Sequence, residues 1–320
     1  MRKKIKIICT LGPSSLNANF LEYSQKNIDL LRLNMSHLSI SELKKNISYI
    51  KKKTNCPICI DTEGAQIRSK YKKRKLLDRN SIIEIRKDED KSLNLYPDYI
   101  NEKLKLNDTL NIGFEGLRIK VIKKKAGKIF AKVLNEGYLE NNKGIHLENR
   151  KIKLKCLTHK DIEAIRIGKL NNINNYALSF TNSLDDVRYF NELTGKNANN
   201  IFKIETKQSI KEFNKIIKEG SNFLIDRGDL SKDISVHKIP ETQRKLLKIK
   251  NNYKNKKIFI ATNLLESMIY NNYPTRAEAN DIYSCIEMGA DGLVLAAETA
   301  IGKNPIECIK FIKEMINQFK

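Results

Sequence analysis

The sequence predicts an α/β fold, a (β/α)8 TIM barrel with a small all-β domain inserted after the third barrel strand. Eight short apolar runs alternate with helical segments, and this rhythm indicates parallel strands joined by right-handed crossovers. Between residues 70 and 152 the helical segments give way to β-branched runs separated by Gly and Asn turns. Polar residues follow the apolar runs at the strand ends where barrel enzymes form their active sites.

Three predicted barrel strands precede the insert and five follow it. The first three are residues 4–10, 28–33 and 57–61, with helices predicted over 20–26 and 41–52 between them. The other five are residues 175–180, 200–205, 222–226, 257–262 and 292–296. Three and five make the eight strands of a closed barrel. We therefore predict one discontinuous barrel domain, residues 1–69 and 153–320, and one inserted β-barrel-like domain, residues 70–152.

The composition excludes several classes of protein. The formal net charge is +23, but the excess Lys is spread along the whole chain. Because nucleic-acid-binding proteins concentrate their charge on one face or helix, we expect no nucleic-acid partner, although a positive field attracts small anionic substrates. No apolar run approaches the ~18 residues of a membrane span. The six Cys form no dense framework, which predicts a cytoplasmic protein with reduced thiols.

Polar side chains at the predicted strand ends form a candidate site. Lys203 and Glu205 alternate along one strand and so point to the same side, and Asp229 follows the next strand. Two carboxylates beside a Lys and Arg32 suit a Mg²⁺ ion that bridges to a phosphate group. Phosphoryl transfer mostly needs such positioning and charge stabilisation. The residues by themselves leave two alternatives open, an active site and an ion-pair network that stabilises the barrel rim.

Several motifs occur in the order found in one enzyme family. Lys6 to Ser15, Arg32-Leu-Asn-Met-Ser-His37 and the run from Ile60 to Arg68 come first. Lys203-Ile-Glu205, Arg227-Gly-Asp-Leu230, the segment from Ala261 to Glu278, and Glu298-Thr-Ala300 follow. Together they resemble the pyruvate kinase family, and the insert falls where that family has one. The resemblance covers about residues 4–318 and is weakest within the insert.

The resemblance implies a role for each matching position. Glu205 and Asp229 match the Mg²⁺ ligands, and Lys203 matches the lysine that stabilises the transferring phosphoryl group. Thr262 lies near the point where the enolate is protonated, so the catalytic residues implied are Lys203, Thr262 and Arg32. The substrate-binding positions implied are Arg32, Gly228, Asp229 and Thr262.

Two further groups of positions also come from the resemblance. The site of a monovalent cation, usually K⁺, corresponds to Asn34, Ser36, Asp61 and Thr62. The nucleotide-binding positions correspond to Asn34, His37, Arg68 and Lys143. Lys143 belongs to the inserted domain, which in the family closes like a lid over the barrel mouth and excludes water from the reacting phosphoryl group.

The chain departs from the family pattern at several points. Asp226 stands where the family has a small apolar residue beside the substrate-binding loop, so its carboxylate either repels phosphoenolpyruvate or points away. Gln66 replaces an acid or a lysine that goes with K⁺ dependence, which leaves the K⁺ requirement open. The stretch 112–117 keeps one acid, Glu115, where the family has an Asp. The chain ends at Lys320, before the family's further domain, so we expect no sugar-phosphate activation and at most a homodimer through the barrel.

Three functions remain as hypotheses. The first is a minimal, unregulated pyruvate kinase that converts phosphoenolpyruvate and ADP into pyruvate and ATP. The second is a diverged paralogue that keeps the Mg²⁺–enolate site and uses another phosphoenolpyruvate or 2-oxo acid substrate, as Asp226 suggests. The third is a non-catalytic basic scaffold, which predicts salt-sensitive oligonucleotide binding and indifference to Lys203.

Overall fold

The computed structural model describes residues 4–87, 92–113, 116–125 and 127–319. The chain divides into two compact units, one formed by Met1–Gly64 and Cys156–Lys320, the other by Ala65–Lys155. Each unit has a hydrophobic core of its own. Phe114 and Glu115, in the stretch that departs from the family pattern, lie outside the described residues.

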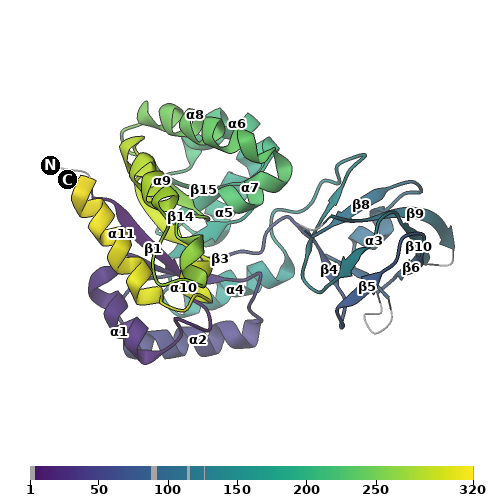
Figure 1. Ribbon diagram of the computed structural model, residues 1–320, viewed down its shortest axis with the longest axis horizontal. Coiled ribbons are helices and arrows are strands. Elements are labelled where there is room, and N and C mark those ends of the chain that lie inside the picture. Colours follow the sequence, from purple (N-terminus) through teal and green to yellow (C-terminus); the bar gives the residue numbers. More distant parts are fainter. Residues whose placement is uncertain (1–3, 88–91, 114–115, 126, 320) are drawn as a thin grey trace. The chain divides into compact units, whose positions relative to one another are not determined.

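The first unit is a barrel. Within the described residues, eight parallel strands close into a barrel (Figure 1), in the order β1-β17-β16-β15-β14-β13-β3-β2. They are β1 (Lys6–Thr10), β2 (Leu30–Asn34), β3 (Ile58–Asp61), β13 (Asn175–Leu178), β14 (Asn199–Ile204), β15 (Asn222–Asp226), β16 (Lys257–Ala261) and β17 (Gly292–Leu295). Each bound falls within two residues of the bound predicted from sequence. The predicted (β/α)8 barrel is therefore confirmed.

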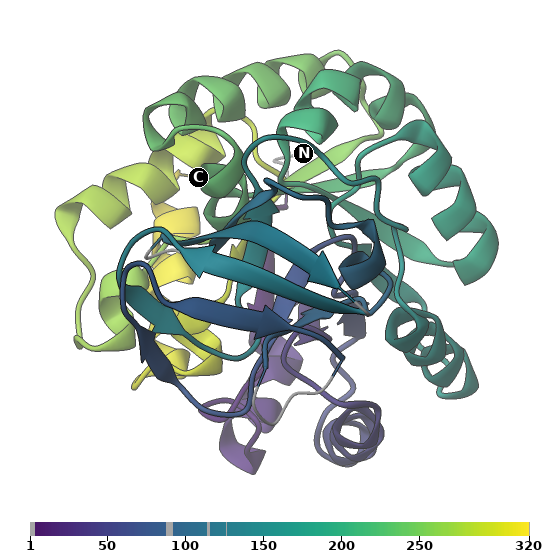
Figure 2. The same ribbon diagram turned by 90° about the vertical axis from the view of Figure 1, so that its right-hand side faces the viewer.

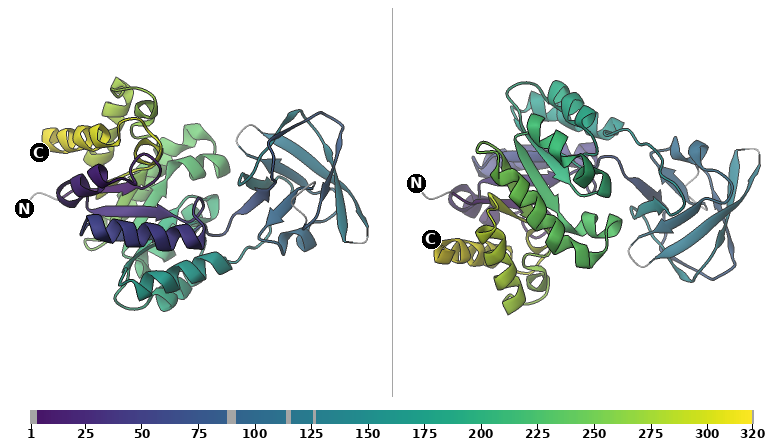
Figure 3. Two further views of the ribbon diagram at one scale, coloured as in Figure 1. Left: turned by 90° about the horizontal axis from the view of Figure 1, so that it is seen from below. Right: turned by 90° about the horizontal axis from the view of Figure 1, so that it is seen from above.

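Helices cover the outside of the barrel strands, as Figure 3 shows from two sides. The helices that join or follow the strands are α1 (Ala18–Asn27), α2 (Ile40–Lys53), α4 (His159–Leu170), α5 (Leu184–Thr194), α6 (Lys207–Glu219), α7 (Arg227–Asp233), α8 (Ile239–Asn251), α9 (Arg276–Glu287), α10 (Ala297–Ala300) and α11 (Pro305–Phe319). Helix α2 buries Leu43, Ile47 and Ile50, one side of the helix, against the strands. No helix within the described ranges has both the length and the apolarity needed to cross a membrane.

The barrel strands carry apolar side chains on both faces, as parallel strands buried on both sides do. The outward-facing set packs under the helices. The inward-facing set fills the barrel itself, with side chains at most 8% exposed. It consists of Ile8, Leu30, Cys59, Ala177, Ile201, Leu224, Phe259, Ala261 and Val294. The barrel is thus a packed core and not a channel.

The second unit is mainly β. Its strands can be followed in Figures 1 and 2. In its described part, a seven-stranded sheet has the order β6-β10-β9-β8-β12-β4-β7, and β11 pairs with β5. The sheet strands are β4 (Ile67–Lys70), β6 (Ile82–Ile85), β7 (Asn94–Tyr96), β8 (Thr109–Ile112), β9 (Leu117–Lys125), β10 (Lys128–Val133) and β12 (Gly144–Leu147). The remaining elements are β5 (Lys75–Leu77), β11 (Gly137–Leu139) and the short helix α3 (Ile100–Lys103).

Candidate active site

A ring of polar side chains lies directly above the packed interior of the barrel. Its members come two residues after inward-facing apolar residues: Lys203 follows Ile201, and Asp226 follows Leu224. Since alternate residues of a strand point to the same face, the polar groups point inward as the apolar residues do. The same spacing relates Thr10, Arg32, Asp61 and Ser179 to the apolar residues below them. The residues of this ring are far apart in the sequence, but they lie close together because the carboxyl ends of the strands meet at one end of the barrel.

Lys203 is the central cation of the ring. Its Nζ lies 3.1 Å from Glu205 Oε2, 3.3 Å from Asp226 Oδ2 and 3.7 Å from Asp61 Oδ2. It also donates a hydrogen bond of 3.2 Å to Ser179 Oγ. Burial alone would lower the pKa of Lys203, but the surrounding carboxylates raise it above its ordinary value. The ammonium therefore stays charged although the residue is only 4% exposed.

Arg32 supplies a second buried cation. Its Nε donates to Asp61 Oδ2 at 2.7 Å, Nη2 lies 2.6 Å from the same oxygen, and Nη1 donates to Thr10 Oγ1 at 2.9 Å. Burial would lower the pKa of Arg32, and the charges of Asp61 and Asp226 outweigh it and raise the pKa. Asp61 thus joins Arg32 to Lys203, which fixes both cations at the barrel end.

Three carboxylates gather beside Lys203. One oxygen each from Glu205, Asp226 and Asp229 lies within 4.8 Å of the other two. Glu205 Oε1 accepts a hydrogen bond of 2.6 Å from Phe180 N. Glu205 Oε2 is buried and lies 3.1 Å from the Lys203 ammonium, and Asp229 Oδ1 pairs with Lys232 Nζ at 2.5 Å. Carboxylate oxygens gathered this closely are the ligands that a divalent cation prefers. The residues present therefore suit Mg²⁺.

The protonation of this cluster follows from its surroundings. Burial raises the pKa of Glu205, and Asp226 and Asp229 add to this effect against the opposing charge of Lys203. Burial also tends to raise the pKa of Asp226, but the positive charges of Lys203 and Arg32 outweigh burial and lower this pKa. Asp226 is therefore an anion inside the site. Of the two alternatives that the sequence left for Asp226, the structure shows the carboxylate directed into the ring.

Thr262, at the end of β16, has a strained backbone. Its φ is +68°, which a β-branched residue rarely adopts and which costs about 1–3 kcal/mol. Arg227 holds this conformation by donating to the Thr262 carbonyl from Nε at 3.0 Å and Nη2 at 2.6 Å. Thr262 Oγ1 accepts from Gly228 N at 2.8 Å and lies 3.3 Å from Asp226 Oδ1. The strain directs the hydroxyl toward the first turn of α7, beside the carboxylates.

Arg227 was not predicted as a site residue, and its contacts suggest a test. We expect Arg227→Met to lower the free energy of unfolding by about 1–3 kcal/mol, because two charge-assisted hydrogen bonds to Thr262 and a 2.7 Å ion pair with Asp281 are lost. Urea unfolding measures the change. Arg188→Met is the control, because the Arg188–Glu219 pair is exposed and its loss is expected to cost less than about 1 kcal/mol. Equal costs for the two variants would contradict this role of Arg227.

The proposed K⁺ positions lie on two neighbouring strands. Asn34 and Asp61 are directly opposite each other in the register of β2 and β3. Asn34 Oδ1 accepts from Ser36 N at 3.0 Å, and Thr62 Oγ1 accepts from Ser179 N at 3.0 Å. The Asp61 carboxylate is already paired with two protein cations. This arrangement offers K⁺ no uncompensated carboxylate.

The proposed nucleotide positions fall in both units. In the barrel unit, exposed His37 donates its backbone N–H to Asn34 O at 3.1 Å. In the second unit, Arg68 on β4 lies opposite Gly144, and Lys143 Nζ pairs with Glu140 at 2.8 Å. The side chain of Gln66 packs against Gly144 on β12.

Sequence reasoning missed four contributors to the ring. Thr10 and Ser179 supply hydroxyls to Arg32 and Lys203. Phe180, with φ +53°, directs its N–H at Glu205, and Arg227 holds Thr262. Thr10 and Ser179 stand two residues after inward-facing apolar residues, a spacing that can be used only once the barrel is known.

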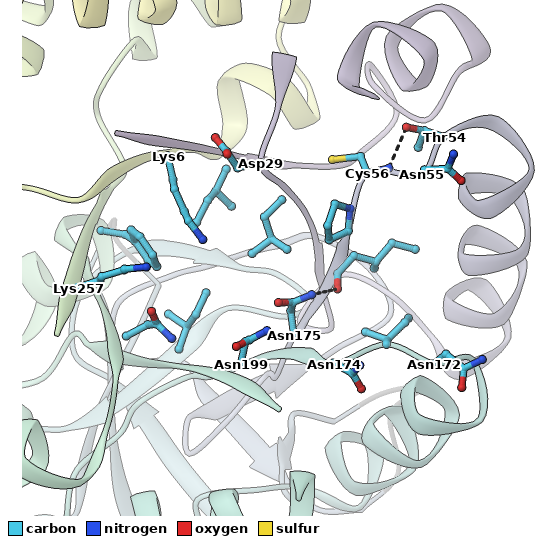
Figure 4. A pocket seen from close by; sticks show the side chains of 18 of the residues that line it. Lys6, Asp29, Thr54, Asn55, Cys56, Asn172, Asn174, Asn175, Asn199 and Lys257 are labelled. Carbon is cyan, nitrogen blue, oxygen red and sulfur yellow. Dashed lines mark hydrogen bonds between the residues drawn. The ribbon is translucent and has the colours of Figure 1, made fainter. Parts of the chain in front are cut away.

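A cavity of about 740 Å³ lies at the opposite, amino-terminal ends of the strands. Figure 4 shows Lys6 and Lys257 beside it, with Asn175 and Asn199 from neighbouring strands. Lys6, Asn175 and Lys257 are the first residues of their strands. None of the predicted site residues lines this cavity.

Comparison with known proteins gives a consistent answer. A family model described as "Pyruvate kinase, barrel domain" matches residues 2–309. A pyruvate kinase of Thermotoga maritima is 31% identical over 99% of this chain and 71% of its own length. One of Geobacillus stearothermophilus is 31% identical over 98% of this chain and 57% of its own length. A pyruvate kinase of Methanocaldococcus jannaschii is 34% identical over 98% of this chain and 69% of its own length.

These relatives are longer than this chain, which spans between 57% and 71% of their lengths. The match extends from one end of this chain almost to the other and includes the barrel strands that hold the polar ring. The chain therefore belongs to the pyruvate kinase family of phosphotransferases.

Proposed function

We propose that this protein transfers the phosphoryl group of phosphoenolpyruvate to ADP and releases pyruvate and ATP. The observation that carries this proposal is the position of Lys203, a buried and charged ammonium among three carboxylates and beside Arg32. Phosphoryl transfer needs fixed positive charge where the migrating group passes, and little covalent chemistry from the protein. A purely structural ion pair would not require a third acid next to it.

The side chains of the ring have distinct roles in this proposal. Arg32 binds the phosphate of the substrate, and Lys203 compensates the negative charge of the group in transfer. Glu205 and Asp229 hold Mg²⁺, which when bound neutralises charge on the phosphoryl oxygens. The P–O bond to the enol oxygen breaks as a P–O bond to ADP forms, and the enolate then takes a proton near Thr262.

The remaining assignments complete the proposal. Gly228 N–H and the Thr262 hydroxyl would bind the substrate carboxylate, and Asp229 would help to hold the ion beside it. Asn34, His37, Arg68 and Lys143 bind the nucleotide. Because Asp61 is paired with Arg32 and Lys203, we propose that K⁺ at Asn34, Ser36, Asp61 and Thr62 modulates turnover and is not required for it. We also propose a cytoplasmic protein and a homodimer formed through the barrel.

An assay coupled to lactate dehydrogenase tests the proposed reaction. In the presence of Mg²⁺ and phosphoenolpyruvate, we expect NADH oxidation that depends on ADP. Adding K⁺ should change the rate less than omitting Mg²⁺. Failure of ADP to support turnover, with Lys203→Met indistinguishable from the parent protein, would refute the proposal.

One observation favours a second candidate function. Asp226 places a third anion inside the ring, where the carboxylate of phosphoenolpyruvate would otherwise meet Thr262. A paralogue that keeps the Mg²⁺–enolate centre would then act on a different 2-oxo acid. Mg²⁺-dependent decarboxylation of oxaloacetate, or exchange of the methyl protons of pyruvate without nucleotide, would support this candidate. Ordinary ADP binding together with ADP-dependent turnover would exclude it.

A further inference from the structure

Asp161, a buried carboxylate on α4, has no part in the proposed reaction. The side chain is fully buried in the first turn of the helix. Its Oδ1 accepts a hydrogen bond of 2.8 Å from Glu63 N, and its Oδ2 accepts from Gly64 N at 3.2 Å and from Thr158 N at 3.0 Å. Burial raises the pKa of Asp161 to about 6 against the opposing effect of the backbone hydrogen bonds, so the group is an anion at neutral pH. Keeping this charge buried costs free energy, which the charge-assisted hydrogen bonds offset.

The contacts of Asp161 join two segments that are far apart in the sequence. Glu63 and Gly64 follow β3, and Thr158 precedes α4, shortly after the chain returns to the barrel unit. The side chain of Glu63 joins the same two segments, because its Oε1 accepts from Thr158 Oγ1 at 2.8 Å and its Oε2 pairs with Lys160 Nζ at 2.5 Å. All of these residues belong to the barrel unit, so the connection is internal to that unit.

Helix capping does not account for all of these contacts. Thr158 and Asp161 form a capping box, in which the acid needs the N–H of the capping residue alone. Asp186 has the same position in the capping box of α5, and it accepts at 2.9 Å from Ser183 N and from the adjacent Asn182 N. Asp161 reaches instead to the end of another strand. Two of its three hydrogen bonds therefore hold the segment after β3 and not the helix.

The segment after β3 continues directly from the polar ring. It begins two residues after Asp61, the carboxylate that joins Arg32 to Lys203. The intervening Thr62 accepts at its Oγ1 a hydrogen bond of 3.0 Å from Ser179 N, and Ser179 Oγ lies 3.3 Å from Asp61 Oδ1. The position of this segment therefore determines where two members of the ring lie.

Gly64 shows how closely the segment packs against the ring. Its φ is +67°, and a Cβ on this residue would lie 2.7 Å from both the Cβ and the carbonyl oxygen of Ser179. The backbone at Gly64 thus rests on Ser179, whose hydroxyl accepts the hydrogen bond from Lys203. Because protein interiors are close-packed, a small displacement of the segment is passed on to Ser179 and to the end of β3.

We propose that Asp161 is a positioning residue for phosphoryl transfer: it holds the N–H groups of Glu63 and Gly64 and so fixes the Asp61 carboxylate that orients the two cations of the ring. Asp161 acts through this segment and not by contact with the substrate. The kinetic part of this proposal rests on the proposed function, whereas the position of the segment can be measured without any turnover.

Asp161→Glu separates positioning from helix capping. Glu is the usual acid at this place in a capping box, so the cap of α4 survives the change. The longer side chain has no room in a fully buried place and must displace the segment after β3. We expect kcat to fall about tenfold or more, with a smaller change in KM for phosphoenolpyruvate, because small misplacements of charged groups slow the reaction strongly. Asp186→Glu is the matched control and should have the kcat of the parent.

Amide hydrogen exchange of the full chain, followed by NMR, measures the position of the segment directly. We expect the amides of Glu63, Gly64 and Ser179 to be protected in the parent. In Asp161→Glu and Asp161→Asn they should exchange about tenfold faster or more, because their hydrogen bonds are lost or weakened. Asp186→Glu should leave the exchange of Glu63 and Gly64 as it is in the parent.

A role in capping alone predicts a different set of results. Asp161→Glu would then have the kcat of the parent, and faster exchange would stay within the first turn of α4. Either result overturns the proposal, as does rapid exchange of Glu63 and Gly64 in the parent. If Asp161→Asn fails to fold, Asp161→Glu decides, since it retains the charge and the cap. If the parent shows no ADP-dependent turnover, the proposed function fails, and the exchange of Ser179 still decides on Asp161.

Discussion

Replacing Lys203 with Met is expected to lower kcat for ADP-dependent pyruvate formation by roughly 10²–10³-fold. The ammonium lies 3.1 Å from Glu205 and 3.3 Å from Asp226, and removing one fixed charge that stabilises a transition state has an effect of about this size. The coupled assay at saturating phosphoenolpyruvate and Mg²⁺ measures it. A smaller effect on KM than on kcat would place the lost interaction in the transition state.

The same substitution is expected to destabilise the protein. Without the ammonium of Lys203, the carboxylates of Asp61, Glu205 and Asp226 lose their shared cation, and breaking a buried pair costs about 3–5 kcal/mol. Lys250→Met is the matched control, because Lys250 pairs with Asp291 at 2.9 Å and is similarly buried, yet lies away from the ring. We expect both variants to lose stability and Lys203→Met alone to lose phosphoryl transfer. If Lys250→Met lost as much activity, the effect of Lys203 would be one of folding.

Replacing Glu205 with Gln is expected to have the second large effect on activity. We expect kcat/KM at subsaturating Mg²⁺ to fall about 10²-fold, since the variant loses one charged ligand of the ion, and to recover in part at higher Mg²⁺. The amide oxygen of Gln can still accept the hydrogen bond from Phe180 N. The geometry of the site is therefore retained, and the change isolates the charge. Steady-state rates over a Mg²⁺ series measure it.

Glu205→Gln, unlike Lys203→Met, is not expected to lower the free energy of unfolding. Burial raises the pKa of Glu205, which means that the folded state holds its charge at a cost. Glu205→Gln is therefore expected to leave the free energy of unfolding unchanged or to increase it. Asp291→Asn, which removes the buried partner of Lys250, is the control and should lower stability without altering the response to Mg²⁺. Loss of stability in Glu205→Gln would show that its charge is needed for folding.

The barrel could be predicted from the sequence because its strands are buried on both faces. Each strand then appears as an uninterrupted apolar run, such as 222–226 or 257–261, bounded by polar residues. Helical segments between the runs leave little alternative to parallel pairing. The second unit was harder to divide into strands from the sequence, since its strands are short and half exposed; β5, β11 and β12 have three or four residues each.

The cluster could be predicted because strand ends meet at one face, but the direction of Asp226 could not. In a strand that is apolar on both sides, as β15 is, the sequence does not mark which alternation faces the barrel axis. Only with the barrel closed is Leu224 seen to face inward, and Asp226 with it. The positive φ of Thr262 and Phe180 was also hidden, because tertiary contacts from Arg227 and Glu205 impose it.

The filled interior of the barrel restricts how molecules reach the ring. Of its nine inward-facing side chains, Ile8, Leu30, Ile201 and Phe259 line the cavity at the opposite strand ends, and the other five lie between that cavity and the polar ring. The buried apolar layer closes the barrel axis to ligands among the described residues. Ligands that enter at the carboxyl-terminal side of the barrel must also leave on that side. The order in which they bind therefore constrains the order in which they are released.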